Sequence, residues 1–465
     1  MKVKSIFVII IIGLQILGCK KAIEIDPPIS GLVSSTVYSS DATSIAALTS
    51  IYERLMGETN FLNGTQGIAL RLGLSADEFK LYSSDINLSQ FYTNSLVSTN
   101  STFWNELYNF VYSCNVAIEQ LSNSTSVSSM IKQQLLGEAK FMRAFFYFYL
   151  VNIYGDVPLL LTSDYRINSI ASRTPKAQVI QQMIADLKEA QNLLTSNYLG
   201  ADLIASTSER TRPNKWAANA LLSRVYLYNG DWANAEDISS TLINNTTMYS
   251  LVSNLNNVFL KNSSEAIFQL QPVKPSYNTL DGNSFILTSN PGISSISPVS
   301  LSSSLVGSFD TTDLRLAKWV GNYNGYYYAN KYKIKGPTTA PVSEYYMVLR
   351  LAEQYLIRAE ARVQQNNISG AQSDLNIIRS RAGLTNTTAA TKASMLTAIN
   401  RERQLELFAE CGHRWLDIKR TNTIDVIMTS IASQKGAVWN SNMALLPVPL
   451  DEINKDPNLV QNPGY

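Results

Sequence analysis

Histidine is almost absent from this chain, since His413 is the only one in 465 residues. Cysteine is also scarce, at three residues, and charged side chains make up only 16% of the sequence. One histidine provides neither a catalytic relay nor the several Cys and His ligands that a zinc site uses. A net charge of +2 gives no basic stripe for nucleic acid. We therefore expect no catalytic residue, no metal, no cofactor and no nucleic-acid partner.

Long apolar runs are missing beyond the first residues. Lys2 and Lys4 precede an apolar run over residues 6–12, which is too short to cross a bilayer, since a spanning helix needs about 20 apolar residues. A charged start, a short apolar stretch and a small-residue end predict a signal peptide over residues 1–18. Residues 17–19, LGC, resemble the bacterial lipobox, which implies lipidation of Cys19. The alternative is an ordinary signal with a chance cysteine. Residues 19–35, with paired prolines and serines, then predict a tether.

Helical periodicity dominates the body of the chain. Apolar residues fall on one helical face over residues 174–194, with Thr174 as the expected N-cap and Pro175 as the first helical residue. Residues 138–153, EAKFMRAFFYFYLVNI, are apolar nearly all round and predict a central helix. Residues 214–244 and 353–383 each contain an apolar helix, a polar turn and a second helix, which is the tetratricopeptide pattern. Any antiparallel helix pair shares part of that pattern.

Residues 250–345 differ in character. Glycines, serines, prolines and aromatic residues replace the helical periodicity there. A long irregular segment inside a compact protein is usually functional or disordered, and its aromatic residues argue against disorder. The sequence thus predicts a mostly α-helical repeat scaffold that carries a loop-rich region.

Several stretches resemble the SusD/RagB family of outer-membrane nutrient-binding lipoproteins. They are residues 138–161, EAKFMRAFFYFYLVNIYGDVPLLL, together with 103–118, 355–384, 401–420 and 445–465. The resemblance implies a mostly α, SusD-like fold with four tetratricopeptide-like pairs, a loop-rich ligand-binding half and minor β-hairpins. It also implies a partner, a SusC-like TonB-dependent transporter, to which the lipoprotein delivers oligosaccharides or, in some members, peptides.

We therefore expect a signal peptide (1–18), a lipidated tether (19–35) and a single SusD-like domain (36–465). Within that domain we expect an N-terminal part (36–245), a loop-rich binding region (250–345) and a C-terminal part (346–465). The expected location is the outer membrane, lipid-anchored and facing the cell exterior.

The segment RERQLELFAECGHRWLDIKR, residues 401–420, gathers a thiol, the lone imidazole and three carboxylates. Residues two apart on a helix point about 200° away from each other, so Cys411 and His413 are not expected to meet. Gly412 between them predicts the end of the helix. We therefore interpret the segment as scaffold.

The carboxylates of this segment repeat every four residues, at positions 402, 406 and 410, and predict one acidic helix stripe. We expect the stripe to pair with two arginines of the preceding repeat helix, while the alternative is a row of solvated charges. The predicted structural ion-pair clamp comprises Arg358, Arg362, Glu402, Glu406, Arg414 and Asp417.

Sugar rings present C–H patches on their faces and hydroxyls on their edges, so aromatic platforms and planar hydrogen-bonding groups recognise them. The candidate ligand-binding residues are Trp319, Asn322, Tyr323, Asn324, Tyr326 and Tyr327 in one cluster, Asp77, Tyr82, Phe91 and Tyr92 in a second, and Tyr277. The alternative for the first cluster is a β-hairpin whose alternate tyrosines are buried. Trp104, Tyr108, Trp216 and Trp232 are expected to be core residues.

The expected function is non-catalytic capture of a nutrient, an oligosaccharide in the first place, for a TonB-dependent transporter. One alternative is a tethered glycoside hydrolase, which needs two carboxylates roughly 5–10 Å apart across a sugar. The others are a peptide-binding lipoprotein and a tetratricopeptide scaffold that binds other proteins.

Overall fold

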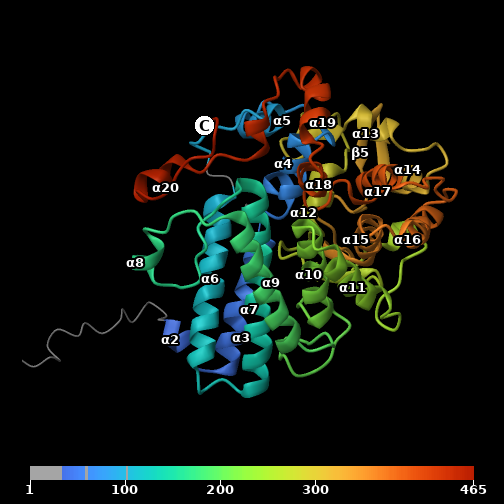
Figure 1. Ribbon diagram of the computed structural model, residues 1–465. Helices are drawn as coiled ribbons and strands as arrows, with labels where there is room; N and C mark the ends of the chain where they lie inside the picture. The colour runs from blue at the N-terminus through green and yellow to red at the C-terminus, as the bar shows by residue number, and fades with distance from the viewer. Residues whose placement is uncertain (1–33, 58–60, 101–102) are drawn as a thin grey trace, which may run out of the picture.

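The computed structural model describes residues 34–57, 61–100 and 103–465. The predicted signal peptide, Cys19 and nearly all of the tether lie outside these residues. The described chain is mostly helical, with a few short strands (Figure 1). Its first helices are α2 (Ser34–Val37), α3 (Asp41–Leu55), α4 (Ile68–Ser75) and α5 (Ile86–Thr93).

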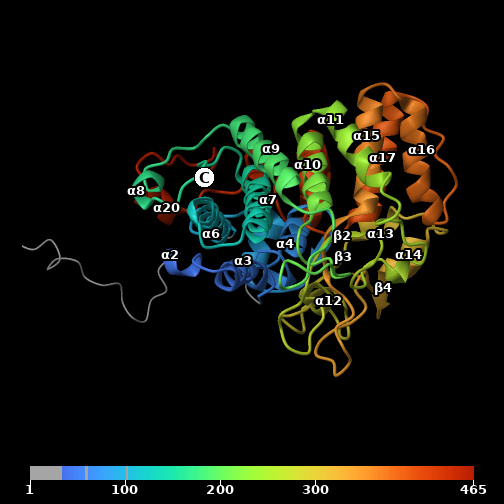
Figure 2. The same ribbon diagram turned by 90° about the horizontal axis from the view of Figure 1, so that it is seen from below.

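A row of long helices forms the scaffold. Each helix contacts the next: α6 packs on α7, α7 on α9, α9 on α10, α10 on α11, α11 on α15, and α15 on both α16 and α17. Figures 1 and 2 show this row from two sides. The helices are α6 (Trp104–Asn123), α7 (Ser129–Tyr154), α9 (Lys176–Leu193), α10 (Lys215–Asn229), α11 (Trp232–Ile243), α15 (Leu351–Gln364), α16 (Ile368–Arg381) and α17 (Lys392–Leu407).

The two predicted helix–turn–helix units are confirmed as α10–α11 and α15–α16. Gly230 ends α10 in the left-handed conformation, at φ 71°, where a Cβ atom is unfavourable. Asp231 then caps α11 by accepting the Asn234 backbone N–H. In the second unit Asn367 caps α16 in the same manner. In both helix–turn–helix units, the turn residues therefore fix where one helix ends and the next begins.

Helix α7 is the central helix that residues 138–153 predict. Its apolar side chains from Phe141 to Tyr154 are buried on all sides, as an all-round apolar helix requires. Two charged residues on it are also buried and paired: Arg143 with Asp186 at 2.7 Å and Glu138 with Arg212 at 2.8 Å. A buried charge is tolerated only with such a partner, so these pairs tie α7 to its neighbours.

The loop-rich segment and the strands lie to one side of the helical row, below it in Figure 2. The strands form three two-stranded antiparallel sheets: β1 (Phe79–Leu81) with β3 (Val299–Leu301), β2 (Ala266–Leu270) with β6 (Tyr346–Arg350), and β4 (Val320–Tyr323) with β5 (Tyr326–Ala329). The remaining helices are short: α8 (Tyr165–Asn168), α12 (Leu280–Phe285), α13 (Ser303–Gly307), α14 (Leu314–Trp319), α18 (His413–Arg420), α19 (Ile424–Ile431) and α20 (Leu450–Lys455).

Two local predictions are wrong. Helix α9 begins at Lys176 with Pro175 as its N-cap, and Thr174 instead pairs with Val157 in an isolated bridge. Helix α17 ends at Leu407, before Gly412, which is the N-cap of α18 at φ 70°. Glu410 therefore lies in the turn between α17 and α18, and the expected continuous acidic stripe includes only Glu402 and Glu406.

None of the helices in the described residues has the length and apolar character that a membrane crossing requires.

Candidate functional site

Glu406 lies at the centre of a buried ion-pair cluster. Its carboxylate is 3.1 Å from Arg315 Nη1 and 2.6 Å from Arg350 Nη1, and it also pairs with Arg381. The four side chains are between 0% and 5% exposed. Burial by itself would raise the pKa of Glu406, but the three guanidinium charges outweigh it and hold that pKa well below its usual range. The carboxylate is thus ionised and fully engaged.

The predicted clamp exists, but with different partners. Arg358 and Arg362 bind Asp374, at 2.6 and 2.9 Å, rather than the stripe on α17. Glu402 pairs with Arg315 at 2.6 Å and with Arg379 at 3.3 Å. The reason is geometric: the arginines that reach α17 come from β6, α14 and α16, whereas the two on α15 point toward α16 and α11.

The other two clamp residues are likewise paired separately. Arg414 forks onto Asp77 with two contacts of 2.7 Å. Asp417 accepts from Arg403 Nε at 2.8 Å and from Arg420 Nε at 2.7 Å. These bonds attach α18 to the strand region on one side and to α17 on the other.

Cys411 and His413 show no catalytic arrangement. Burial raises the pKa of the Cys411 thiol to about 12, and its sulfur contacts the Met347 carbonyl and the Tyr346 hydroxyl. Burial also lowers the pKa of His413 to about 4, against the opposing charge of Glu353. A protonated thiol and a neutral, buried imidazole are structural groups. The interpretation of this segment as scaffold agrees with these contacts.

The tyrosine-rich segment forms the β4–β5 hairpin. Its strands pair Gly321 with Tyr328 and Tyr323 with Tyr326, so these four residues share one face. Asn324 and Gly325 make the turn with φ of 51° and 86°, as an Asn-Gly hairpin turn requires. One face of the hairpin therefore carries three tyrosine rings, each partly exposed.

Gly321 makes room for one of these rings. A Cβ atom added to Gly321 would lie 2.2 Å from the Tyr328 ring. The ring thus packs directly across the backbone of the neighbouring strand, in the space that a larger residue at position 321 would occupy. This contact fixes the direction of Tyr328 on a hairpin that is otherwise open to solvent.

Tyr82 extends the aromatic face beyond the hairpin. Its ring meets the Tyr326 ring edge-on, with centroids 5.4 Å apart, and Lys80 Nζ lies 5.3 Å from its ring centroid. Gly292 contacts the Tyr82 backbone so closely that a Cβ atom would lie 2.2 Å from its carbonyl oxygen. We call Tyr82, Tyr323, Tyr326 and Tyr328 the tyrosine face.

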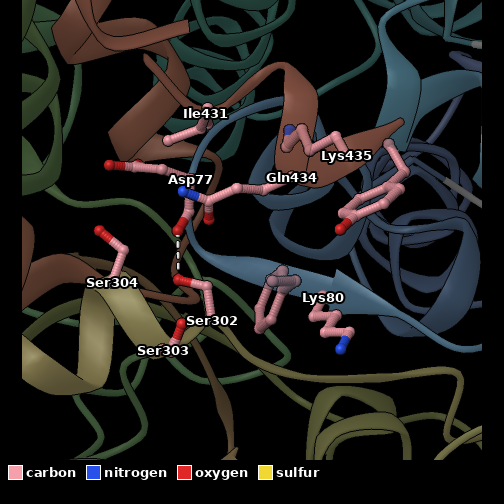
Figure 3. Close-up of a pocket in the computed structure, with 10 residues that line it drawn as sticks. Asp77, Lys80, Ser302, Ser303, Ser304, Ile431, Gln434 and Lys435 are labelled. Atoms are coloured by element: carbon pink, nitrogen blue, oxygen red, sulfur yellow. Dashed lines mark hydrogen bonds between the residues drawn. The ribbon is translucent and has the colours of Figure 1, made fainter. Parts of the chain in front are cut away.

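Lys80, whose ammonium lies at the Tyr82 ring, also lines a pocket of about 150 Å³ (Figure 3). Lys80 forms part of its wall, and the Gln434 amide and the hydroxyls of Ser302 and Ser303 also line it. Ser302 Oγ donates to the backbone carbonyl of Asp77 at 2.5 Å, the dashed bond in Figure 3. The pocket thus joins strand β1, helix α13 and the segment after α19, which are far apart in the sequence.

Two candidate ligand residues are in the core, which corrects the prediction. Trp319 is 0% exposed, and its indole N–H donates to the Leu255 carbonyl at 2.9 Å. Phe91 is also 0% exposed and packs against Phe103. Trp319 is the last residue of α14 and Phe91 lies within α5, and both side chains are on the buried side of these short helices, so neither can meet a ligand.

The remaining candidates fall into distinct places. Asn322 and Tyr327 form a cross-strand pair on the opposite face of the hairpin, and Asn324 is in the exposed turn. Asp77 and Tyr92 line the pocket. Tyr277 lies on a separate loop, bridged to Pro337, with Lys274 Nζ 4.2 Å from its ring centroid. The structure therefore brings the tyrosine face and the pocket together, but not Tyr277.

Sequence reasoning did not single out Ser302, Ser303, Gln434 or Lys435 as pocket residues. They lie far from Asp77 in the chain, and none belongs to an aromatic or charged cluster. No local pattern marks them, because only the tertiary packing of α13 and α19 against β1 places them together.

The helical repeats thus carry an exposed aromatic face beside a polar pocket. Residues 304–465 match the SusD family, and residues 60–227 match a family described as starch-binding and associating with the outer membrane. Together the two matches cover most of the described chain, and the chain belongs to the SusD/RagB family.

Individual relatives resemble the chain over most of its length. SusD-like protein P25 of Formosa agariphila is 24% identical, with all of both chains covered. A SusD superfamily protein of Bacteroides vulgatus has a TM-score of 0.77 at 23% identity, covering 92% of this chain and all of that one. A laminarin-binding SusD-like protein has a TM-score of 0.74 at 24% identity, covering 91% and 99%. These structures share the mostly helical SusD-like fold.

Proposed function

We propose that the protein captures an oligosaccharide on its tyrosine face and delivers it to a SusC-like TonB-dependent transporter. The observation that carries the proposal is the alignment of Tyr323, Tyr326 and Tyr328 on one hairpin face, continued by Tyr82. Family-level glycan binding and association with the outer membrane support it.

The geometry suits a sugar chain more than a compact ligand. Partly exposed tyrosine rings offer flat apolar surfaces to the C–H faces of sugars, while their hydroxyls reach the ring edges. The rings are held from below: Tyr328 by Gly321, and Tyr82 by Tyr326 and by the Ser300 hydroxyl at 3.5 Å. An extended ligand can contact several such rings in succession, which a rigid row of platforms favours.

Binding to a glycan panel tests this proposal. The panel contains laminarin, starch, mannan, xylan and acidic polysaccharides, and the readouts are affinity electrophoresis and calorimetry. We expect Tyr326→Ala to weaken binding about tenfold, equivalent to ~1.4 kcal/mol. Tyr165→Ala is the matched control, because Tyr165 is 77% exposed on α8, away from the hairpin.

Equal binding by the wild type and Tyr326→Ala would contradict the assignment of the tyrosine face. Binding of peptides without binding of any glycan would contradict the ligand class. Incubation with each glycan is expected to leave it intact, and release of shorter products would favour a hydrolase.

The anchor and the transporter form the second part of the proposal. The LGC sequence at residues 17–19 and the family's association with the outer membrane support a lipid on Cys19. We expect the wild type to incorporate labelled palmitate and to fractionate with outer membranes, and Cys19→Ser to do neither. Purification of the intact protein from mild detergent is expected to recover a TonB-dependent β-barrel, and its absence would contradict the partnership.

A further inference from the structure

The pocket beside the tyrosine face contains an excess of positive charge. Lys80 is exposed and lines the pocket, and no carboxylate among the described residues forms an ion pair with it. Its ammonium group lies instead over the Tyr82 ring, at 5.3 Å. A cation over an aromatic face still attracts an anion, because the ring neutralises none of its formal charge.

Asp77, the one acidic group among the described residues that line the pocket, does not offset this charge. Both carboxylate oxygens of Asp77 are held by Arg414, at 2.7 Å each, so these two charges cancel. The neighbouring Glu78 is buried, accepts the Ala409 backbone N–H and does not line the pocket. Burial raises the pKa of Glu78 to about 8, so it is mainly neutral near pH 7.

Lys435 is a second cation in the pocket wall. Its Nζ donates to the carbonyls of Leu74, Ser75 and Ala76 at 2.6, 3.0 and 2.5 Å, and it lies 5.2 Å from the Tyr92 ring centroid. These carbonyls leave it no free donor, and burial lowers its pKa to about 7. Lys435 therefore closes the end of α4, while Lys80 is the cation that is free to meet a ligand.

The position of Lys80 connects the pocket with the tyrosine face. A sugar that lies beside Tyr82 would hold its ring substituents within reach of the Lys80 ammonium, which lies at this ring and at the wall of the pocket. We propose that this pocket receives the anionic group of an acidic sugar, a uronate carboxylate or a sulfate, as the ion-pair partner of Lys80. The inference rests on the proposed function and names the class of its ligand: anionic oligosaccharides.

Neutral and acidic glycans provide the test. The probes are polygalacturonate, alginate and hyaluronan as uronates, carrageenan as a sulfate ester, and laminarin, starch, mannan and galactan as neutral chains. We expect binding to at least one acidic probe, about tenfold weaker in Lys80→Glu and several-fold weaker in Lys80→Gln, since a charge-assisted contact is removed. Uronate and sulfate probes distinguish the two anions.

Lys188→Glu is the matched control, because Lys188 is an exposed lysine on α9 and its reversal changes the net charge equally. It is expected to leave binding unchanged, and all variants are expected to keep the wild-type melting temperature. Acidic glycan binding that is insensitive to Lys80→Glu, or equally sensitive to Lys188→Glu, would overturn the inference. Binding to neutral glycans alone, dependent on Tyr326, would overturn it and leave the proposed function standing. Binding to no glycan would overturn both.

Discussion

The ion-pair cluster around Glu406 and the tyrosine face use polar groups in opposite ways. In the cluster, every carboxylate oxygen of Glu406 meets a guanidinium, and the side chains are almost fully buried. On the tyrosine face, the rings are partly exposed, and Lys80 beside them has no ion-pair partner among the described residues. Trp319 lies between the two regions. It directly precedes β4 of the hairpin, and its ring contacts Lys331, Arg350 and Arg381 on the side of the cluster.

This difference separates the scaffold from the site. A charge with all its partners supplied by the protein has nothing left to offer a ligand, whereas removal of one partner leaves an uncompensated buried charge. Exposed rings and an unpaired cation contribute little to folding and remain available for binding. Variants in the first region should therefore change stability, and variants in the second should change affinity.

The largest effect is expected for Glu406→Ala. It removes the carboxylate that Arg315, Arg350 and Arg381 share, while each keeps another acidic partner, and breaking a buried pair costs about 3–5 kcal/mol. Chemical denaturation of the soluble form lacking residues 1–19 measures the loss. Folded Glu406→Ala with unchanged stability but abolished glycan binding would reverse the assignment of the two regions.

Acidification should destabilise the scaffold through His413. Burial lowers its pKa to about 4 from an ordinary 6.5, so the unfolded chain takes up a proton that the folded chain cannot. The free energy of unfolding contributed by this group is complete above pH 6.5 and is lost as the pH falls toward 4, by at most about 3 kcal/mol. The free energy of unfolding of the wild type minus that of His413→Gln, measured as a function of pH, isolates the contribution of His413.

The two buried carboxyls whose pKa is raised, Glu78 and Asp281, act in the opposite direction, and they are present in both the wild type and His413→Gln. Burial raises the pKa of Glu78 to about 8 and that of Asp281 to about 7, so their contributions decline as the pH rises above the unfolded value. Parallel stability curves for wild type and His413→Gln between pH 4 and 6.5 would show that His413 is not held neutral.

A smaller effect, on affinity alone, is expected for Gly321→Ala. The new methyl group would collide with the Tyr328 ring and displace it from the tyrosine face. We expect glycan affinity to fall several-fold, by ~1 kcal/mol, while the exposed hairpin costs little stability. Gly307→Ala is the control, since a Cβ atom there meets nothing within 4 Å. Equal affinity of both variants would show that the Tyr328 ring is not used.

The smallest effect is expected for Glu189→Ala. Its side chain is 58% exposed and pairs with Lys140 on the surface of the scaffold at 3.0 Å. Exposed pairs contribute only about 0.2–1 kcal/mol, so both stability and affinity should stay close to the wild type. A loss comparable with that of Glu406→Ala would mean that burial does not decide which ion pairs matter.

Much of the scaffold was predictable because its signals are local. The apolar faces of α9 and α10, the turns at Gly230 and Asn367, and the all-round apolar α7 each follow from residues close in sequence. The partners of Glu406 were not predictable, since they come from three separate elements and several arginines in the chain have equivalent local surroundings.

The site was predictable only in part for the same reason. The run of tyrosines and the Asn-Gly turn point to a hairpin, but the pairing register decides that Tyr326 and Tyr328 share a face while Tyr327 lies opposite. Trp319 has the composition of a ligand platform, yet its place at the end of α14 puts it against Leu255 and Phe259 in the core. Whether a single aromatic residue is buried depends on tertiary packing, which its neighbours in the sequence do not reveal.

The most direct test of the central claim is a crystal structure of the protein with the tightest-binding oligosaccharide of the panel. We expect sugar rings stacked on Tyr82 and Tyr326, with the oligosaccharide reaching the pocket at Lys80. An oligosaccharide bound elsewhere on the molecule, such as the hollow beside Arg212 and Val273, with the tyrosine face empty, would contradict it.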